Sequence, residues 1–93
     1  MLFRSAAILE RELDSVRLTS NGSRNHAINR AAFVVGQIAH LLGESDDWIT
    51  EQFLQAAEAN GAVQDNGIGS TIATIRSGLA AGKSRPREVT GTR

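Results

Sequence analysis

The chain has 93 residues, a formal net charge of zero, 41% apolar residues and no cysteine. This length predicts one small domain, and the lack of cysteine excludes disulfides and a thiolate zinc site. The longest nearly apolar run, residues 31–42, is too short to span a bilayer, and the N-terminus lacks a signal-peptide pattern. The sequence therefore predicts a cytoplasmic protein that does not associate with membranes.

The first half of the chain predicts two helices. Over residues 3–17, apolar residues recur every three or four positions between charged ones, which is typical of an amphipathic helix. A second helix is predicted over residues 24–42 and is apolar on nearly all sides, which indicates a central position among the others. Shortening Phe33 or Val35 within it is expected to be costly. Gly43 is expected to end this helix in the left-handed conformation.

The second half predicts two further helices and a tail. A helix over residues 46–60 begins with two aspartates, which suit the positive end of a helix dipole. A helix over residues 69–81 contains glycine and threonine, so it should depend on packing. We therefore predict an all-α fold, a compact bundle of about four helices in residues 1–82. Residues 83–93 are expected to form a flexible basic tail or linker.

The zero net charge hides a segregation of charges along the chain. Residues 1–30 carry five arginines and three acids, residues 31–75 carry six acids and no lysine or arginine, and residues 76–93 carry five basic residues and one acid. A basic side formed by the two ends could meet an anionic partner, while the acidic middle would repel it.

Groups that could perform catalysis do not converge in this sequence. His26 and His40 fall in one predicted helix, where 14 residues separate them by about 21 Å, so they should not share a metal. Asp46 and Asp47 are adjacent, and a helix N-terminus explains them without catalysis. We expect no catalytic residue, no metal site and no cofactor of the domain's own, although ATP or another nucleoside triphosphate could be a ligand.

Candidate binding residues cluster at the start of the central helix. Arg24 adds a forked donor to backbone N–H groups that already attract anions. Asn25 and Asn29, four residues apart, share a helix face. These residues and Arg30 predict a phosphate or nucleotide contact. The alternative is structural: the asparagines bond to neighbouring loops, and Arg30 pairs with an acid.

Two further groups of basic residues are candidates for binding phosphate. Arg76 lies two residues before Gly78, which would permit close approach of a ligand or of another backbone. The alternative is a surface arginine and a packing glycine. Lys83 and Arg85 alternate with small residues in the predicted tail, which could be a phosphate-binding arm or simply a solvated linker.

Several of these segments together resemble a known family. Residues 22–25 (GSRN), 29–33 (NRAAF), 36–37 (GQ) and 74–82 (TIRSGLAAG) resemble the helical region that follows the catalytic domain in archaeo-eukaryotic primase-polymerases of phages and plasmids, the primase C-terminal type. The resemblance covers roughly residues 5–87. Ser23 stands where the family usually has threonine, and residues 64–69 lack the usual acid-rich helix start.

The resemblance implies a helix bundle that helps to hold the template and the initiating nucleotide, while a separate catalytic domain binds metal. It implies contacts to phosphate, base or sugar from Arg24, Asn25, Asn29, Arg30 and Arg76. The partners would be single-stranded DNA, a nucleoside triphosphate, the primase catalytic domain and, in some polypeptides, a helicase domain.

We expect Arg24 and Arg76 to meet in a joint anion site. This requires their helices to cross, because an up-and-down bundle would make the two helices parallel and keep the two arginines apart. Two other functions are open: a docking module between primase and helicase domains that does not touch nucleic acid, and a small independent regulator. Basic residues on one face would favour anion binding, and their dispersal would favour docking.

Overall fold

The structure, a computed structural model, describes residues 2–19 and 24–88, and within these ranges every regular element is a helix. The all-α prediction is confirmed. The helices are α1 (Leu2–Leu18), α2 (Arg24–Leu42), α3 (Asp46–Ala59), α4 (Ala62–Asn66) and α5 (Ile68–Lys83).

The structure has one helix more than the four that were predicted, because the connection between α3 and α5 itself winds into the short helix α4. Gly61 and Gly67 bracket this helix and adopt φ angles of 87° and 86°, a region that glycine enters without strain. Ala62, the first residue of α4, is fully buried. The segment therefore turns tightly and buries an apolar side chain where the sequence suggested only a connection.

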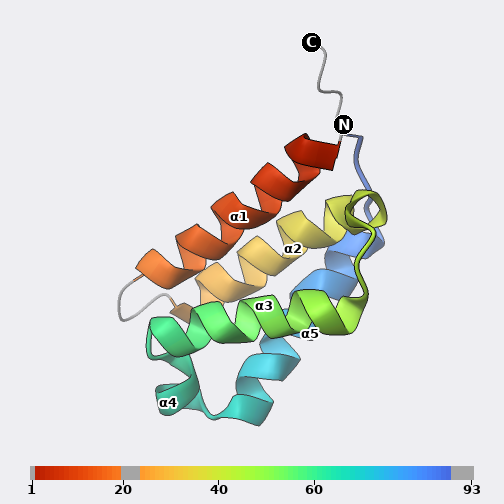
Figure 1. Ribbon diagram of the computed structural model, residues 1–93. Helices are drawn as coiled ribbons and strands as arrows, with labels where there is room; N and C mark the ends of the chain where they lie inside the picture. Colours follow the sequence, from red (N-terminus) through yellow and green to blue (C-terminus); the bar gives the residue numbers. More distant parts are fainter. Residues whose placement is uncertain (1, 20–23, 89–93) are drawn as a thin grey trace.

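The arrangement of the long helices follows from the direction of each chain segment. In Figure 1, α1 and α2 lie side by side in opposite directions, α3 crosses them, and α5 runs behind α2. Residues of α5 meet residues of α2 in the same order along both helices: Thr74 bonds to Asn25, and Gly78 lies against Asn29. Hence α2 and α5 are parallel and not crossed.

The core is made mainly of aliphatic side chains from the four long helices, together with Ala62 of α4, and the aromatic Phe53 of α3 is its largest member. Helix α2 contributes seven buried residues, the most of any helix, whereas the shorter α3 buries six of its 14. Val35 is fully buried and Phe33 is half-buried. The predicted phase of the central helix is therefore right, although α3 is buried to a similar extent.

The helix ends carry the predicted signals. Gly43 follows α2 with a φ of 73°, as a left-handed cap. The Ser45 hydroxyl accepts a hydrogen bond from the Trp48 N–H at 3.0 Å and caps α3, and both aspartates lie in the first turn of this helix. Ser23, which precedes α2, lies outside the described residues.

The C-terminal segment departs from the predicted boundary at residue 82. Helix α5 continues to Lys83, and the backbone of Arg85 and Arg87 is hydrogen-bonded to Gln37 of α2. Residues 84–88 therefore continue along the C-terminal half of α2. A flexible tail stays a prediction for residues 89–93, which lie outside the described residues.

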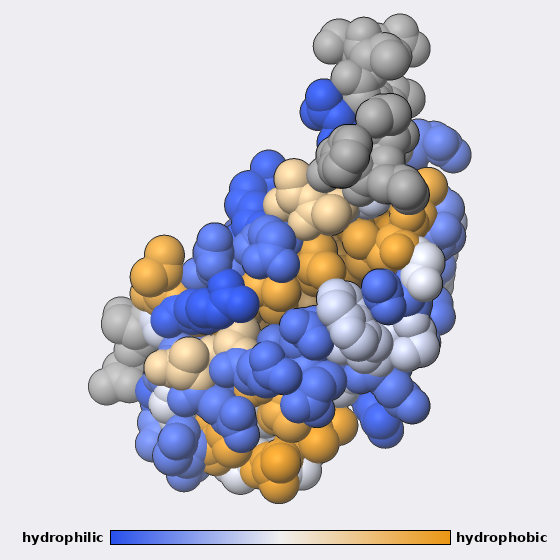
Figure 2. Space-filling model, in the orientation of Figure 1, coloured by the Kyte–Doolittle hydropathy of each residue, from blue (hydrophilic) through white to orange (hydrophobic). Residues whose placement is uncertain are grey.

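Polar and apolar side chains are separated on the surface. On the face drawn in Figure 2, hydrophilic side chains cover α3, and apolar ones show over the C-terminal half of α2. Among the described helices, none combines the length and the apolar character that crossing a membrane would require.

Candidate nucleic-acid interface

Arg24, the first residue of α2, ties three parts of the bundle together. Its Nη1 donates a hydrogen bond to the Asn60 carbonyl oxygen at 2.8 Å, and its Nη2 forms an ion pair with Asp65 of α4. The side chain is only 13% exposed. A Cβ on Gly61 would lie 2.9 Å from Nη1, so this glycine leaves room for the guanidinium. Arg24 thus fastens α2 to the α3–α4 turn.

Asn60 extends this connection to α1. Its side-chain Nδ2 donates to the Val16 carbonyl oxygen at 2.8 Å, and its Oδ1 accepts from the Ala62 N–H at 2.8 Å. The asparagine therefore joins the ends of α1 and α3 while its carbonyl holds Arg24. The sequence predicted only that a helix ends at residue 60, and it carried no signal of this connecting role.

Asn25 and Asn29 share the face of α2 that meets α5, as their spacing predicted. Asn29 Nδ2 donates to the Thr74 carbonyl oxygen at 3.3 Å, and the Thr74 hydroxyl donates to Asn25 Oδ1 at 3.2 Å. Both asparagines remain exposed. Thr74 and the neighbouring Ser77 were not named as site residues, although both lie inside the segment 74–82 that carries the family resemblance.

Glycines let α2 and α5 approach until backbone touches backbone. A Cβ on Gly78 would lie 2.5 Å from the Asn29 carbonyl oxygen, and one on Gly82 would lie 2.1 Å from the Phe33 carbonyl oxygen. On the other helix, a Cβ on Gly36 would lie 2.4 Å from the Leu79 carbonyl oxygen. All three approaches are too close for any side chain. The packing interpretation of Gly78 is therefore confirmed.

Arg30 and His26 are exposed on the side of α2 nearer to α1. Arg30 lines a hollow with Glu12 and Ser15 of α1, and its side chain forms no hydrogen bond or ion pair with any described residue. His26 lines this hollow and also a second one, which Asn25, Asn29, Ser70, Thr74 and Ser77 line. The two hollows therefore join at His26 into one polar surface, which we call the α2–α5 surface.

Arg76 and Lys83 face the N-terminus of α3. Arg76 Nη2 lies 3.6 Å from Asp47 Oδ1, and Lys83 Nζ lies 2.9 and 2.8 Å from the two carboxylate oxygens of Asp46. All four side chains are exposed, Lys83 and Asp46 to about half of their surface. The same two aspartates that begin the helix are thus shared with α5.

The expected joint site of Arg24 and Arg76 does not form. Arg24 lies at the C-terminal end of α3, beside Asn60, and Arg76 lies at its N-terminal end, beside Asp47. The 14 residues of α3 separate these ends by about 20 Å. Crossed packing, on which the prediction depended, is absent because the small residues of α2 and α5 let the two helices lie parallel. Each guanidinium instead pairs with a nearby acid.

The other predicted basic residues are likewise spread over the surface. Arg30 lies beside α1, whereas Lys83 pairs with α3. Arg85 is exposed, and its carbonyl oxygen accepts a hydrogen bond from Gln37 Nε2 at 3.1 Å. Five basic residues were predicted to bind an anion. Three of them instead form ion pairs with acidic residues from the middle of the chain: Arg24, Arg76 and Lys83.

The described residues contain no group of three His, Asp or Glu side chains placed to hold a metal ion. His26 and His40 lie on the same helix, and both are exposed. A comparison with protein-family models, with curated proteins and with solved structures found no match to this chain.

Proposed function

We propose that the chain is the non-catalytic helix-bundle domain of a DNA primase-polymerase and that it contacts single-stranded template DNA, the initiating nucleoside triphosphate, or both. The observation that supports this most is the pairing of α2 with α5. The segments that resemble the primase family, residues 24–37 and 74–82, lie against each other over their whole length. Their outward polar residues share the α2–α5 surface.

The α2–α5 surface offers groups that suit a nucleotide chain. Asn25, Asn29, Thr74 and Ser77 provide neutral donors and acceptors, and Arg30 adds a guanidinium that no described acid occupies. Arginine binds phosphate through a planar fork. Neither hollow is lined by Phe, Tyr or Trp, so the imidazole of His26 is the one aromatic ring among the lining residues on which a base could stack. Binding would be weak and would depend on hydrogen bonds and one principal charge.

A division of labour within the full polypeptide follows from this proposal. The catalytic domain would supply the carboxylates for two metal ions, and the bundle would hold template and first nucleotide until a dinucleotide forms. The isolated chain should then show neither polymerase nor ATPase activity. A role in replication also assigns the domain to the cytoplasm, which is that of the host cell if a phage encodes it.

A chemical-shift titration of the chain with a short single-stranded DNA, with and without ATP or GTP, tests the proposal. Shifts should cluster at Asn25, Asn29, Arg30 and Ser77. Arg30→Ala should weaken DNA binding and lower the slope of log affinity against log salt by about 0.7, the value for one phosphate contact on a single strand. Arg17→Ala, which removes the same charge from α1 at a residue that lines neither hollow and pairs with Asp14, is the matched control and should leave the slope unchanged.

One observation favours the docking alternative. Arg24, Arg76 and Lys83 are paired with acids of the same domain, and Arg24 lies at the opposite end of α3 from the other two. A module that binds the primase catalytic domain or a helicase domain needs no common basic face. If neither DNA nor triphosphate shifts the α2–α5 surface, and the neighbouring catalytic domain does, the docking function replaces the first proposal.

A further inference from the structure

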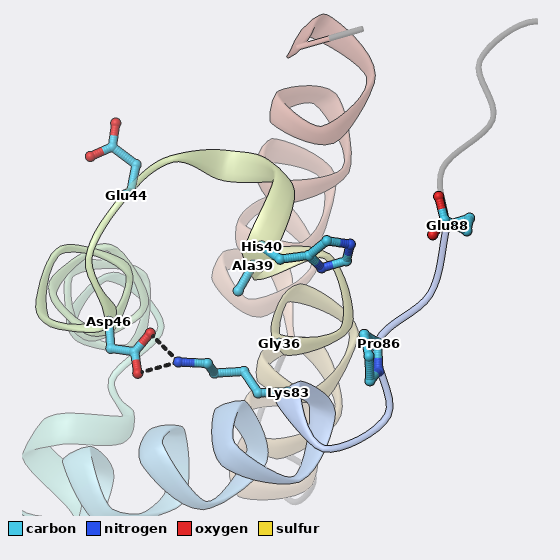
Figure 3. A pocket seen from close by; sticks show the side chains of 8 residues that line it. All are labelled: Gly36, Ala39, His40, Glu44, Asp46, Lys83, Pro86 and Glu88. Carbon is cyan, nitrogen blue, oxygen red and sulfur yellow. Dashed lines mark hydrogen bonds and ion pairs between the residues drawn. The ribbon is translucent and has the colours of Figure 1, made fainter.

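The chain does not leave the bundle freely after α5. The Ser84 hydroxyl donates to the Ala81 carbonyl oxygen at 2.7 Å, and the Arg85 N–H donates to the Gly82 carbonyl oxygen at 2.9 Å. These bonds finish the last helical turn and redirect the backbone. The segment that follows, residues 84–88, then passes along the C-terminal half of α2, and we call it the strap (Figure 3).

Gln37 of α2 holds the strap at two points. Its side-chain Nε2 donates to the Arg85 carbonyl oxygen at 3.1 Å, and its backbone carbonyl oxygen accepts from the Arg87 N–H at 3.0 Å. A carbonyl oxygen in a helix has two lone pairs, so Gln37 can accept from Arg87 as well as within its own helix. One residue thus binds an acceptor and a donor that lie two positions apart on the strap.

The residue between these two bonds fits the arrangement. Pro86 has no N–H and a fixed φ angle, so it leaves no donor unpaired and lowers the entropy lost when the strap is ordered. Its ring lines a hollow together with Gly36, Ala39 and His40 of α2 (Figure 3). The carbonyl oxygen of Arg85 therefore accepts from the Gln37 side-chain amide, and the N–H of Arg87 donates to the Gln37 backbone carbonyl oxygen. Pro86, between them, has no N–H that would need a partner.

The strap also starts from a fixed point. The backbone of Gly82 lies against the Phe33 carbonyl oxygen, and Lys83 pairs with Asp46 across the same end of the bundle. Because α5 is anchored in this way, only a short stretch of chain lies between the end of the rigid helix and the contacts with Gln37. Closing so short a loop costs little entropy, which favours a strap that stays in place.

We propose that Gln37 clamps residues 84–88 onto α2 and so fixes the direction in which the chain leaves the bundle. Gln37 is then a positioning residue that couples the strap to α2. A pull or rotation applied at Glu88 would act first on the Gln37 contacts. This inference does not rest on the proposed function, because it concerns only contacts within the chain.

Amide hydrogen exchange of the 93-residue chain tests the clamp. The Arg87 amide should exchange more slowly than in an unstructured peptide, by about fivefold or more for one hydrogen bond. Gln37→Ala, and Gln37→Met, which keeps the side-chain size but lacks the donor, should lower this protection while leaving the interior of α2 protected, because the strap loses its side-chain bond although the Gln37 carbonyl oxygen remains. The matched control is Gln55→Ala, because the Gln55 side chain bonds only within α3.

Trypsin provides a second readout on the same variants. The enzyme does not cut before proline, so Arg87–Glu88 is the informative bond in the strap, and cleavage there should accelerate in both Gln37 variants but not in Gln55→Ala. Two results would overturn the proposal: an Arg87 amide that exchanges at the peptide rate in the unmodified chain, or protection that is not lowered by the loss of the Gln37 side-chain amide. Neither result would bear on DNA or nucleotide binding at the α2–α5 surface.

Discussion

Helices α2 and α5 are joined by glycine and alanine, whereas α3 is fastened at both ends by charged groups. Between α2 and α5, three glycines bring backbone against backbone, and no side chain could be added without a clash. At α3, Arg24, Arg76 and Lys83 reach acids or carbonyl groups at the rim of the bundle. The contact between α2 and α5 depends on shape and excludes water. The contacts of α3 depend on charged groups, which water also stabilises.

The two contacts should therefore respond differently to substitution. In a close-packed interface, the cost of added volume is set by how far a backbone must move. In an exposed ion pair, the gain is small because solvent screens both charges. Arg24 should fall between these cases, since it is charged like the α3 contacts but mostly buried.

The largest effect is expected from Gly82→Ala. The new methyl group would lie 2.1 Å from the Phe33 carbonyl oxygen, so α5 must move away from α2. We expect a loss of about 3 kcal/mol in the free energy of unfolding, at the upper end for overpacking because the obstacle is backbone. Urea denaturation measures it.

The matched control for this substitution is Gly69→Ala in the same helix. No atom lies within 4 Å of the methyl group it would introduce. Alanine should stabilise the chain there by about 0.5 kcal/mol, because it restricts the unfolded backbone. Equal effects of the two substitutions would show that α2 and α5 are not in close contact.

A smaller loss is expected from Val35→Ala, which removes two methyl groups from a fully buried position on α2. The lost burial and the remaining cavity together should cost about 2 kcal/mol. Val34→Ala is the natural control, because the neighbouring valine is only half-buried. Thermal unfolding of both variants would test the phase of α2, which is wrong if Val34→Ala proves the more harmful.

Arg24→Ala should cost about 1–2 kcal/mol. It leaves the part-buried Asn60 carbonyl oxygen without its guanidinium donor and removes the ion pair with Asp65. Arg24→Lys should recover only part of this loss, because an ammonium group cannot reach two acceptors in the same fork geometry. Full stability of Arg24→Ala in urea denaturation would mean that the contact with Asn60 contributes nothing.

The sequence was most informative where a pattern is local. Helix positions, the Gly43 cap and the two aspartates at the start of α3 all depend on residues within a few positions of each other, and the structure agrees with them. The short helix α4 was missed because five residues between two glycines give too few positions for a periodic pattern.

The candidate site was harder to predict, because its contacts join residues that lie between 29 and 49 positions apart in the sequence. Arg24 comes close to Asp65, and Arg76 to Asp47, only because α3 and α4 pack against the other helices. The spacing of Asn25 and Asn29 predicted that they share a face, but not that Thr74 lies opposite them. Charge segregation indicated a basic side, yet it could not reveal that the acidic middle folds against the basic ends.

The smallest effects are expected from Arg76→Ala and Lys83→Ala. The Arg76 side chain is 64% exposed, and its partner Asp47 is more exposed still. Exposed pairs of this kind contribute at most about 0.5 kcal/mol, since the Coulomb attraction in water is offset by the entropy of holding two long side chains. Molar salt shortens the Debye length to about 3 Å and should remove even this difference, whereas the loss in Arg24→Ala should largely persist. Urea denaturation of the three variants at low and high salt makes the measurement. If Arg76→Ala matches Arg24→Ala in cost and in salt response, burial does not set the value of these contacts.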